Sequence, residues 1–138
     1  MKKDLCKNKA GCYADILYYI LSFCIPVAGT LLILKSRGFY PFKEDTLFVL
    51  DMHDQFMEFY ASLRYILGGD NSVFYSWARS LGGSYIGLYA YYLANPLSWI
   101  TVLFPLEKFH AAILTLTLLK IGCCGLTFSV FASYLWKR

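Results

Sequence analysis

Charged residues are scarce in this 138-residue chain, at only 16% of the sequence. An average soluble domain contains about a quarter charged residues. Hydrophobic residues make up 58% and aromatic residues 19% of the chain. There is no run of Lys or Arg beyond the N-terminus and the net charge is only +4, which argues against a nucleic-acid-binding surface. The composition therefore indicates a membrane protein.

Several familiar motifs are also missing. The sequence contains no glycine-rich phosphate-binding loop, no dinucleotide fingerprint and no G-x-S-x-G motif, which removes the common signatures of three large enzyme classes. No cysteine lies between Lys35 and His110, and no cysteine spacing matches a zinc site. We interpret the cysteines as small apolar side chains. They are Cys6, Cys12, Cys24, Cys123 and Cys124.

Two long apolar runs are present instead. Residues 16–34 contain no charge, and residues 111–136 contain only one, Lys120. A helix of about 20 residues crosses the hydrocarbon layer of a bilayer, so both runs are predicted to be transmembrane helices. A cleaved signal peptide is the alternative for the first run, but its apolar character continues to Leu34, which favours an uncleaved anchor.

The distribution of cations predicts the orientation. Four lysines precede the first run, and two cations, at 137–138, follow the second. Loops rich in Lys and Arg stay in the cytoplasm. We therefore expect residues 1–15 and 137–138 to be cytoplasmic and residues 35–110 to form one long extracytoplasmic loop.

Residues 81–105 form a third stretch without charge. Glycines and the Asn95–Pro96 pair interrupt it, and it is rich in tyrosine, which prefers the membrane interface. A third span would also leave the cations at 137–138 outside the cell. We interpret residues 81–105 as an interfacial segment of the loop, packed on protein or on the membrane surface.

Residues 51–67, DMHDQFMEFYASLRYIL, have the periodicity of an amphipathic helix. Gly68 and Gly69 follow it and suit a left-handed helix end. At 100° per residue, apolar side chains gather on one face and polar side chains on another. The polar face carries Asp51, Asp54, Gln55, Glu58 and Ser62.

Three interpretations of this polar face remain open. Asp51 caps the helix and the other carboxylates are solvated. Alternatively, Asp54 shares a divalent cation, Mg²⁺ or Mn²⁺, with Asp51 or Glu58. In the third, one carboxylate in a partly dry cleft acts as a general base. His53 points away from the acidic strip in a regular helix, so zinc is not expected.

The second apolar run carries two further features. Lys120 is costly inside a membrane, by about 2.5–3.5 kcal/mol at the centre of a span. It can extend to the outer interface, pair within a helix bundle or bind a lipid phosphate. The spacing Gly122-x-x-Gly125 is typical of a close helix–helix contact.

Three longer motifs resemble one known family. They are DTLFVLDMHDQFMEFYASLRYIL, FYSWARSLGGSYIGLYAYYLANPLSWITVLFP and LLKIGCCGLTF. From about residue 39 to residue 135 the chain resembles the N-terminal region of the YfhO family of bacterial membrane proteins. The resemblance implies an all-α integral membrane protein of the GT-C glycosyltransferase type, with two transmembrane helices flanking a long extracytoplasmic loop.

The resemblance also implies a reaction. Such enzymes transfer a sugar from a polyprenyl phosphate to an acceptor outside the bacterial cytoplasmic membrane, and this family is linked to lipoteichoic acid. Asp51 occupies the position of the catalytic aspartate, and Gln55 and Lys120 are the expected substrate-binding residues. No metal ligand is implied, and dependence on Mg²⁺ or Mn²⁺ stays open.

Family members are much longer than this chain, so we expect an N-terminal part that is inactive alone. Two other hypotheses do not depend on catalysis. The chain is a small two-span protein that binds a partner through its tyrosine- and glycine-rich loop, or it is part of a transporter.

Overall fold

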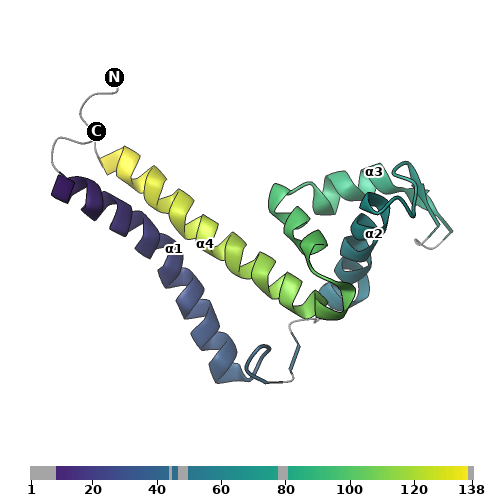
Figure 1. Cartoon of the computed structure of the whole chain (residues 1–138), viewed down its shortest axis with the longest axis horizontal. Coiled ribbons are helices and arrows are strands. Elements are labelled where there is room, and N and C mark those ends of the chain that lie inside the picture. Colours follow the sequence, from purple (N-terminus) through teal and green to yellow (C-terminus); the bar gives the residue numbers. More distant parts are fainter. Residues whose placement is uncertain (1–8, 44, 47–49, 78–80, 137–138) are drawn as a thin grey trace. The chain divides into compact units, whose positions relative to one another are not determined.

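The computed structural model (Figure 1) describes residues 9–43, 45–46, 50–77 and 81–136. The chain divides into two compact units. The terminal unit combines Met1–Arg37 with Thr117–Arg138, and the middle unit is Gly38–Leu116. The cations that carry the orientation prediction at positions 2, 3, 7 and 137–138 lie outside the described residues.

The terminal unit consists of one long helix and most of another. Helix α1 covers Lys9–Arg37, and helix α4 covers Phe109–Trp136. The first two turns of α4, up to Leu116, belong to the middle unit. Mean hydropathy is 2.1 within Tyr13–Arg37 and 1.8 within Leu106–Trp136. Both are long and apolar enough to cross a membrane, as the sequence predicted, and they are the two such helices among the described residues.

Two glycines of α4 allow close contact with α1 within the terminal unit. A Cβ atom on Gly122 would collide with the ring of Phe23. A Cβ atom on Gly125 would lie 2.8 Å from Cγ of Pro26 and would overlap the carbonyl oxygen of Ser22. The Gly-x-x-Gly spacing therefore serves as the helix contact that the sequence indicated.

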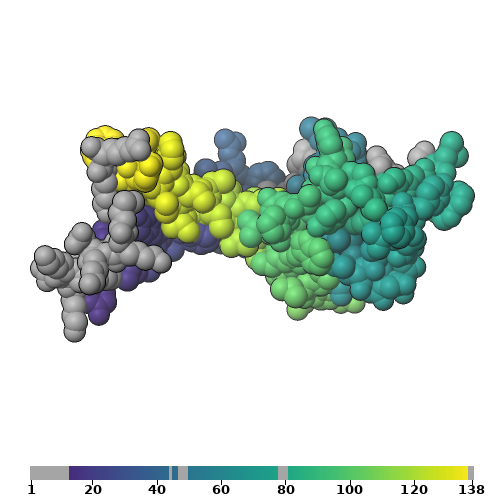
Figure 2. Space-filling model, turned by 90° about the horizontal axis from the view of Figure 1, so that it is seen from above, coloured from purple at the N-terminus to yellow at the C-terminus, as the bar shows by residue number. Residues whose placement is uncertain are grey.

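The middle unit is built from short elements. In the space-filling view (Figure 2), its teal and green residues form one closely packed body. The helical elements before the strand pair are η1 (Met52–Phe56) and α2 (Met57–Leu67). The elements after them are β1 (Tyr75–Ser76), β2 (Gly83–Ser84), α3 (Tyr85–Leu88), η2 (Tyr89–Leu93), η3 (Pro96–Leu103) and η4 (Leu106–Lys108).

Residues 81–105 do not form one long helix, because capping side chains begin a new helix at two positions. The Ser84 hydroxyl accepts a hydrogen bond from the Gly87 N–H at 3.4 Å and begins α3. The Asn95 side chain accepts one from the Leu97 N–H at 2.9 Å and begins η3, with Pro96 in its first turn. Such N-caps and N-terminal prolines are favoured where helices begin. Tyr85, Leu88 and Leu93 of this segment are buried in the middle unit, whereas Tyr91 and Leu103 are exposed.

The apolar face of α2 forms the centre of the middle unit. Leu63 is 2% exposed and Tyr60 is 4% exposed. Both belong to one buried cluster with residues of α3, η2 and the first turns of α4. The buried cluster consists of Tyr60, Leu63, Ile66, Tyr85, Leu88, Leu93, Phe109, Ile113 and Leu116.

Helix α2 ends as the sequence predicted. The N–H of Asp70 donates to the Tyr65 carbonyl at 2.9 Å, and the N–H of Gly69 donates to the Ile66 carbonyl at 3.1 Å. Gly69 has φ +88°, the left-handed conformation that glycine adopts without strain. This is a Schellman motif, which satisfies the last carbonyls of the helix.

The strand pair departs from the all-α prediction, although the chain is mostly helical. Tyr75 pairs with Ser84 and Ser76 with Gly83 in an antiparallel register. Gly82 precedes β2 with φ +93°, and a Cβ atom there would overlap the Tyr75 hydroxyl. That hydroxyl donates to the Leu81 carbonyl at 3.4 Å. Two-residue strands are too short to give a recognisable alternation in sequence.

Replacing Gly82 with alanine is therefore expected to destabilise the strand pair. A non-glycine residue in the left-handed region costs about 1–2 kcal/mol, and the new methyl group displaces Tyr75. Hydrogen exchange of the amides of residues 75–76 and 83–84 should accelerate in Gly82→Ala. Gly83→Ala is the matched control, because a Cβ atom on Gly83 meets nothing within 4 Å. Equal exchange in both variants would contradict this assignment.

Candidate functional site

Asp51 lies immediately before η1, with its backbone in the right-handed helical region at φ −54° and ψ −26°. Its side chain makes no capping hydrogen bond. The interpretation of Asp51 as an N-cap is therefore wrong. An N-cap residue needs an extended backbone for its side chain to reach the free N–H groups, and Asp51 continues the helix instead.

The first turn after Asp51 is wider than an α-helix. The N–H of Met57 bonds to the carbonyl of Met52, five residues earlier, which defines a π-helical turn. The prediction that His53 points away from the acidic strip assumed a regular helix and is wrong. Nδ1 of His53 lies 2.8 Å from Oδ1 of Asp54. The two exposed side chains, neighbours in sequence, pair with each other.

The apolar side of η1 holds this turn in place. Met52 and Phe56 pack against the core of the middle unit. The ring of Phe56 meets Tyr92 edge-on with centroids 5.3 Å apart. Tyr92 belongs to η2, which is also π-helical. Wide turns of this kind are found frequently at functional sites. Asp51 and Gln55 are both exposed beside this anchored turn.

Exposure limits the chemistry available to the described residues alone. Because Asp51 is exposed, the described residues do not form the partly dry cleft expected for a general base. They also contain no group of three or more His, Cys, Asp or Glu side chains able to hold a metal ion. Since the Asp54 carboxylate pairs with His53, the donor set of the described residues does not fit a divalent cation.

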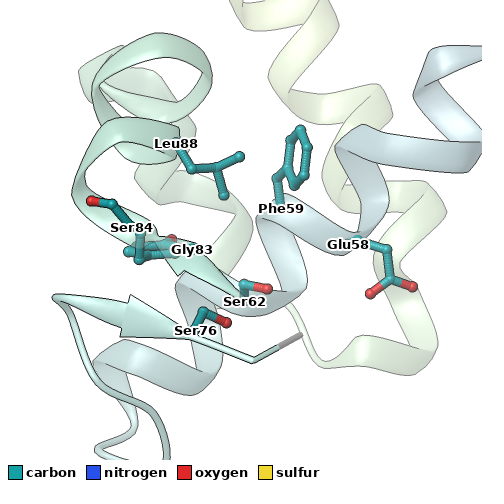
Figure 3. Close-up of a pocket in the computed structure, with 8 residues that line it drawn as sticks. Glu58, Phe59, Ser62, Ser76, Gly83, Ser84 and Leu88 are labelled. Atoms are coloured by element: carbon teal, nitrogen blue, oxygen red, sulfur yellow. The ribbon is translucent and has the colours of Figure 1, made fainter. Parts of the chain in front are cut away.

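A small polar pocket opens beside α2, between that helix, the strand pair and α3 (Figure 3). In Figure 3, Phe59 and Leu88 point toward each other, Ser62 and Ser76 lie together, and Glu58 extends away from them. The enclosed space is ≈ 20 Å³, room for one water-sized group. Its lining consists of Glu58, Phe59, Ser62, Ser76, Gly83, Ser84, Tyr85 and Leu88.

Tyr85 also lines a second, almost wholly apolar pocket of ≈ 240 Å³. Its side chain is 3% exposed, and its hydroxyl has no hydrogen-bond partner within the described part of the chain. Burial raises the pKa of Tyr85 to about 12, and the neighbouring Tyr89 adds to the increase. Tyr89 itself accepts a hydrogen bond from Nε1 of Trp99 at 3.1 Å. Tyr85 therefore remains a protonated, unused donor.

Sequence reasoning missed Arg64. Its guanidinium donates to the carbonyl of Val102 at 3.1 Å and to the carbonyl of Phe104. These two carbonyls lie at the end of η3, where helix dipoles favour a cation. The available signal was a lone cation beside the apolar face of α2, but its acceptors lie 38 and 40 residues further along the chain.

Lys120 lies in α4 and is partly buried. It belongs to the terminal unit, whereas Asp51 and Gln55 belong to the middle unit. No carboxylate of the described residues forms an ion pair with Lys120. Lys120 therefore does not pair with a carboxylate within the described part of the terminal unit. Two of the predicted positions for its ammonium group stay open: the outer membrane interface and contact with a lipid phosphate.

Two helices of membrane-spanning length and apolarity, with a helical middle unit between them in the sequence, are typical of a helical membrane protein. The family described as bacterial membrane protein YfhO matches residues 22–138. The chain belongs to this family, as its motifs predicted. Comparisons with curated proteins and with solved structures found no match.

Removing the Arg64 side chain should loosen η3. Hydrogen bonds to a charged group contribute about 1.5–3 kcal/mol each, so Arg64→Ala is expected to lower the stability of the middle unit by about 2–3 kcal/mol. Hydrogen-exchange mass spectrometry should show faster exchange in residues 96–104. Lys108→Ala, which removes an exposed cation, is the control. Unchanged exchange in Arg64→Ala would contradict the anchoring role.

Proposed function

We propose that this chain contributes to a GT-C type glycosyltransferase that uses a polyprenyl-phosphate-linked sugar. The acceptor would be a cell-envelope polymer such as lipoteichoic acid. Membership of the YfhO family and the two membrane-length helices support the membrane setting. The middle unit, Gly38–Leu116, would work at the extracytoplasmic face, as the distribution of cations in the sequence favours.

Asp51 is the proposed catalytic base. Its carboxylate takes the proton from an acceptor hydroxyl, and the acceptor oxygen attacks the anomeric carbon of the donor. The bond from that carbon to the phosphate oxygen breaks, and polyprenyl phosphate leaves with the electron pair. The observation that carries this assignment is the exposed position of Asp51 beside a helical turn whose Met52 and Phe56 pack against the core.

Gln55 and Lys120 have supporting roles in this proposal. Gln55 is exposed four residues after Asp51 and can donate an amide hydrogen bond to the acceptor or to the Asp51 carboxylate. Lys120 would pair with the donor phosphate, since an unpaired ammonium in an apolar helix is costly. The described carboxylates do not fit a divalent cation, so the proposed reaction contains no metal step.

A specific observation favours one second function. Near the strand pair, large apolar side chains are strongly exposed: Phe74 at 74%, Trp77 at 78% and Leu81 at 90%. Exposed aromatic clusters mark interaction sites more often than ordinary surface. The alternative is therefore a non-enzymatic membrane protein that binds a partner through this surface. It predicts that Trp77, and not Asp51, is required for function.

Replacing Asp51 with asparagine tests the enzymatic proposal. Asparagine keeps the shape of the side chain but cannot accept a proton, so sugar transfer to cell-envelope polymers should fall about 100-fold or more. Transfer is measured with radiolabelled sugar in membranes that contain the intact protein. Asp54→Asn is the matched control, and it should retain the wild-type rate. Wild-type transfer by Asp51→Asn would exclude Asp51 as the base.

Cysteine labelling tests the proposed orientation. A membrane-impermeant maleimide added to intact cells should label Asn71→Cys, because Asn71 is exposed in the middle unit. The native Cys6 and Cys12 should react only after the cells are permeabilised. Labelling of Cys6 in intact cells would reverse the topology.

A further inference from the structure

We infer that the polar pocket beside α2 is a subsite for one hydroxyl group of a carbohydrate. This inference rests on the proposed function and assigns part of its substrate contact. The pocket presents two opposed surfaces, with the serines Ser62 and Ser76 on one side and Phe59 and Leu88 on the other (Figure 3). A sugar ring offers the same combination of hydroxyl groups and an apolar C–H face.

The polar groups of the pocket match a hydroxyl ligand. A serine hydroxyl can both donate and accept a hydrogen bond, and so can the hydroxyl of a sugar. Ser62 comes from α2, Ser76 from β1 and Ser84 from the start of α3. Tyr85 lines both this pocket and the apolar pocket beside Tyr89 and Trp99. The three serines are therefore the hydroxyl groups assigned to the ligand.

The dimensions of the pocket set the size of the group that enters. The enclosed space of ≈ 20 Å³ exceeds the minimum for one water molecule. It accepts a hydroxyl group and excludes a whole sugar ring, which would remain at the surface. Gly83 lines the pocket with its backbone. A Cβ atom built on it would meet nothing within 4 Å, so that direction leads to open space and not into the enclosed volume.

The position of the pocket connects it with the proposed reaction centre. Ser62 and Glu58 lie four residues apart in α2 and so share one face of that helix. Glu58 lines the pocket and is exposed. Continuing toward the N-terminus, Gln55 and Asp51 are exposed on η1. A carbohydrate chain held by the pocket could extend along exposed polar side chains toward Asp51.

Direct sugar binding tests this subsite without requiring transfer. Saturation-transfer NMR on the intact purified protein measures the affinity for glucose and for its 2-, 3-, 4- and 6-deoxy analogues. Glucose is expected to bind, and one deoxy analogue should bind about three- to tenfold more weakly because one hydrogen bond is lost. In Ser62→Ala, glucose and that analogue should bind equally.

Filling the pocket provides a second variant. Ser62→Val adds bulk at a lining position and removes the hydroxyl group, so it should weaken glucose binding about tenfold. Ala90→Val is the control: Ala90 is exposed in η2 and lies outside the pocket lining, so this variant should not change binding. Wild-type affinity in Ser62→Val, or no glucose binding by the wild-type protein, would mean that the pocket holds only water and would overturn the inference.

The two proposals fail in different ways. If Asp51→Asn retains transfer while Ser62→Val loses glucose binding, the glycosyltransferase assignment of Asp51 is wrong and the sugar subsite stands. If Asp51→Asn loses transfer while Ser62→Val binds glucose normally, the subsite is wrong and the reaction assignment stands.

Discussion

Burial of the apolar face of α2 is the interaction on which the middle unit depends. Fully burying a side chain such as Leu63 contributes about 1.5–3 kcal/mol, and Leu63 is 2% exposed. The elements around it, α3, η2 and η3, have four to eight residues each. Helices this short are not stable in isolation. They form because each places an apolar side chain against α2, and Arg64 then fixes the carbonyl end of η3.

The two units satisfy the hydrogen-bonding needs of their backbone N–H and C=O groups in different ways. In α1 and α4 almost every polar backbone group bonds within its own helix, which an apolar surrounding requires. In the middle unit, side chains such as Ser84 and Asn95 accept the hydrogen bonds that short helices leave unmade at their starts. This difference explains why residues 81–105, although uncharged, do not form a third long helix. Their glycines, prolines and capping residues favour several short helices instead.

Periodicity predicted the features that depend on local spacing. The amphipathic α2, its glycine end, the two long apolar helices and the Gly122/Gly125 contact all follow from residue spacing and side-chain size. Tertiary contacts decided the rest. The π-turn of η1 packs against Tyr92 in η2, and the partners of Arg64 lie about 40 residues away. No local pattern encodes such distant partners, so the position of His53 was predicted wrongly and Arg64 was not predicted.

The carboxylates of η1 and the start of α2 also show why the type of residue alone does not identify a catalytic group. Asp51, Asp54 and Glu58 all lie near an N-terminal helix end, where the dipole favours carboxylates by about 0.3–1 kcal/mol. Their surroundings separate them. Asp54 pairs with His53 at 2.8 Å, and Glu58 borders the polar pocket. Asp51 neither caps the helix nor joins that ion pair, and it is exposed beside a turn packed against the core, which is why we propose Asp51, and not Asp54, as the base.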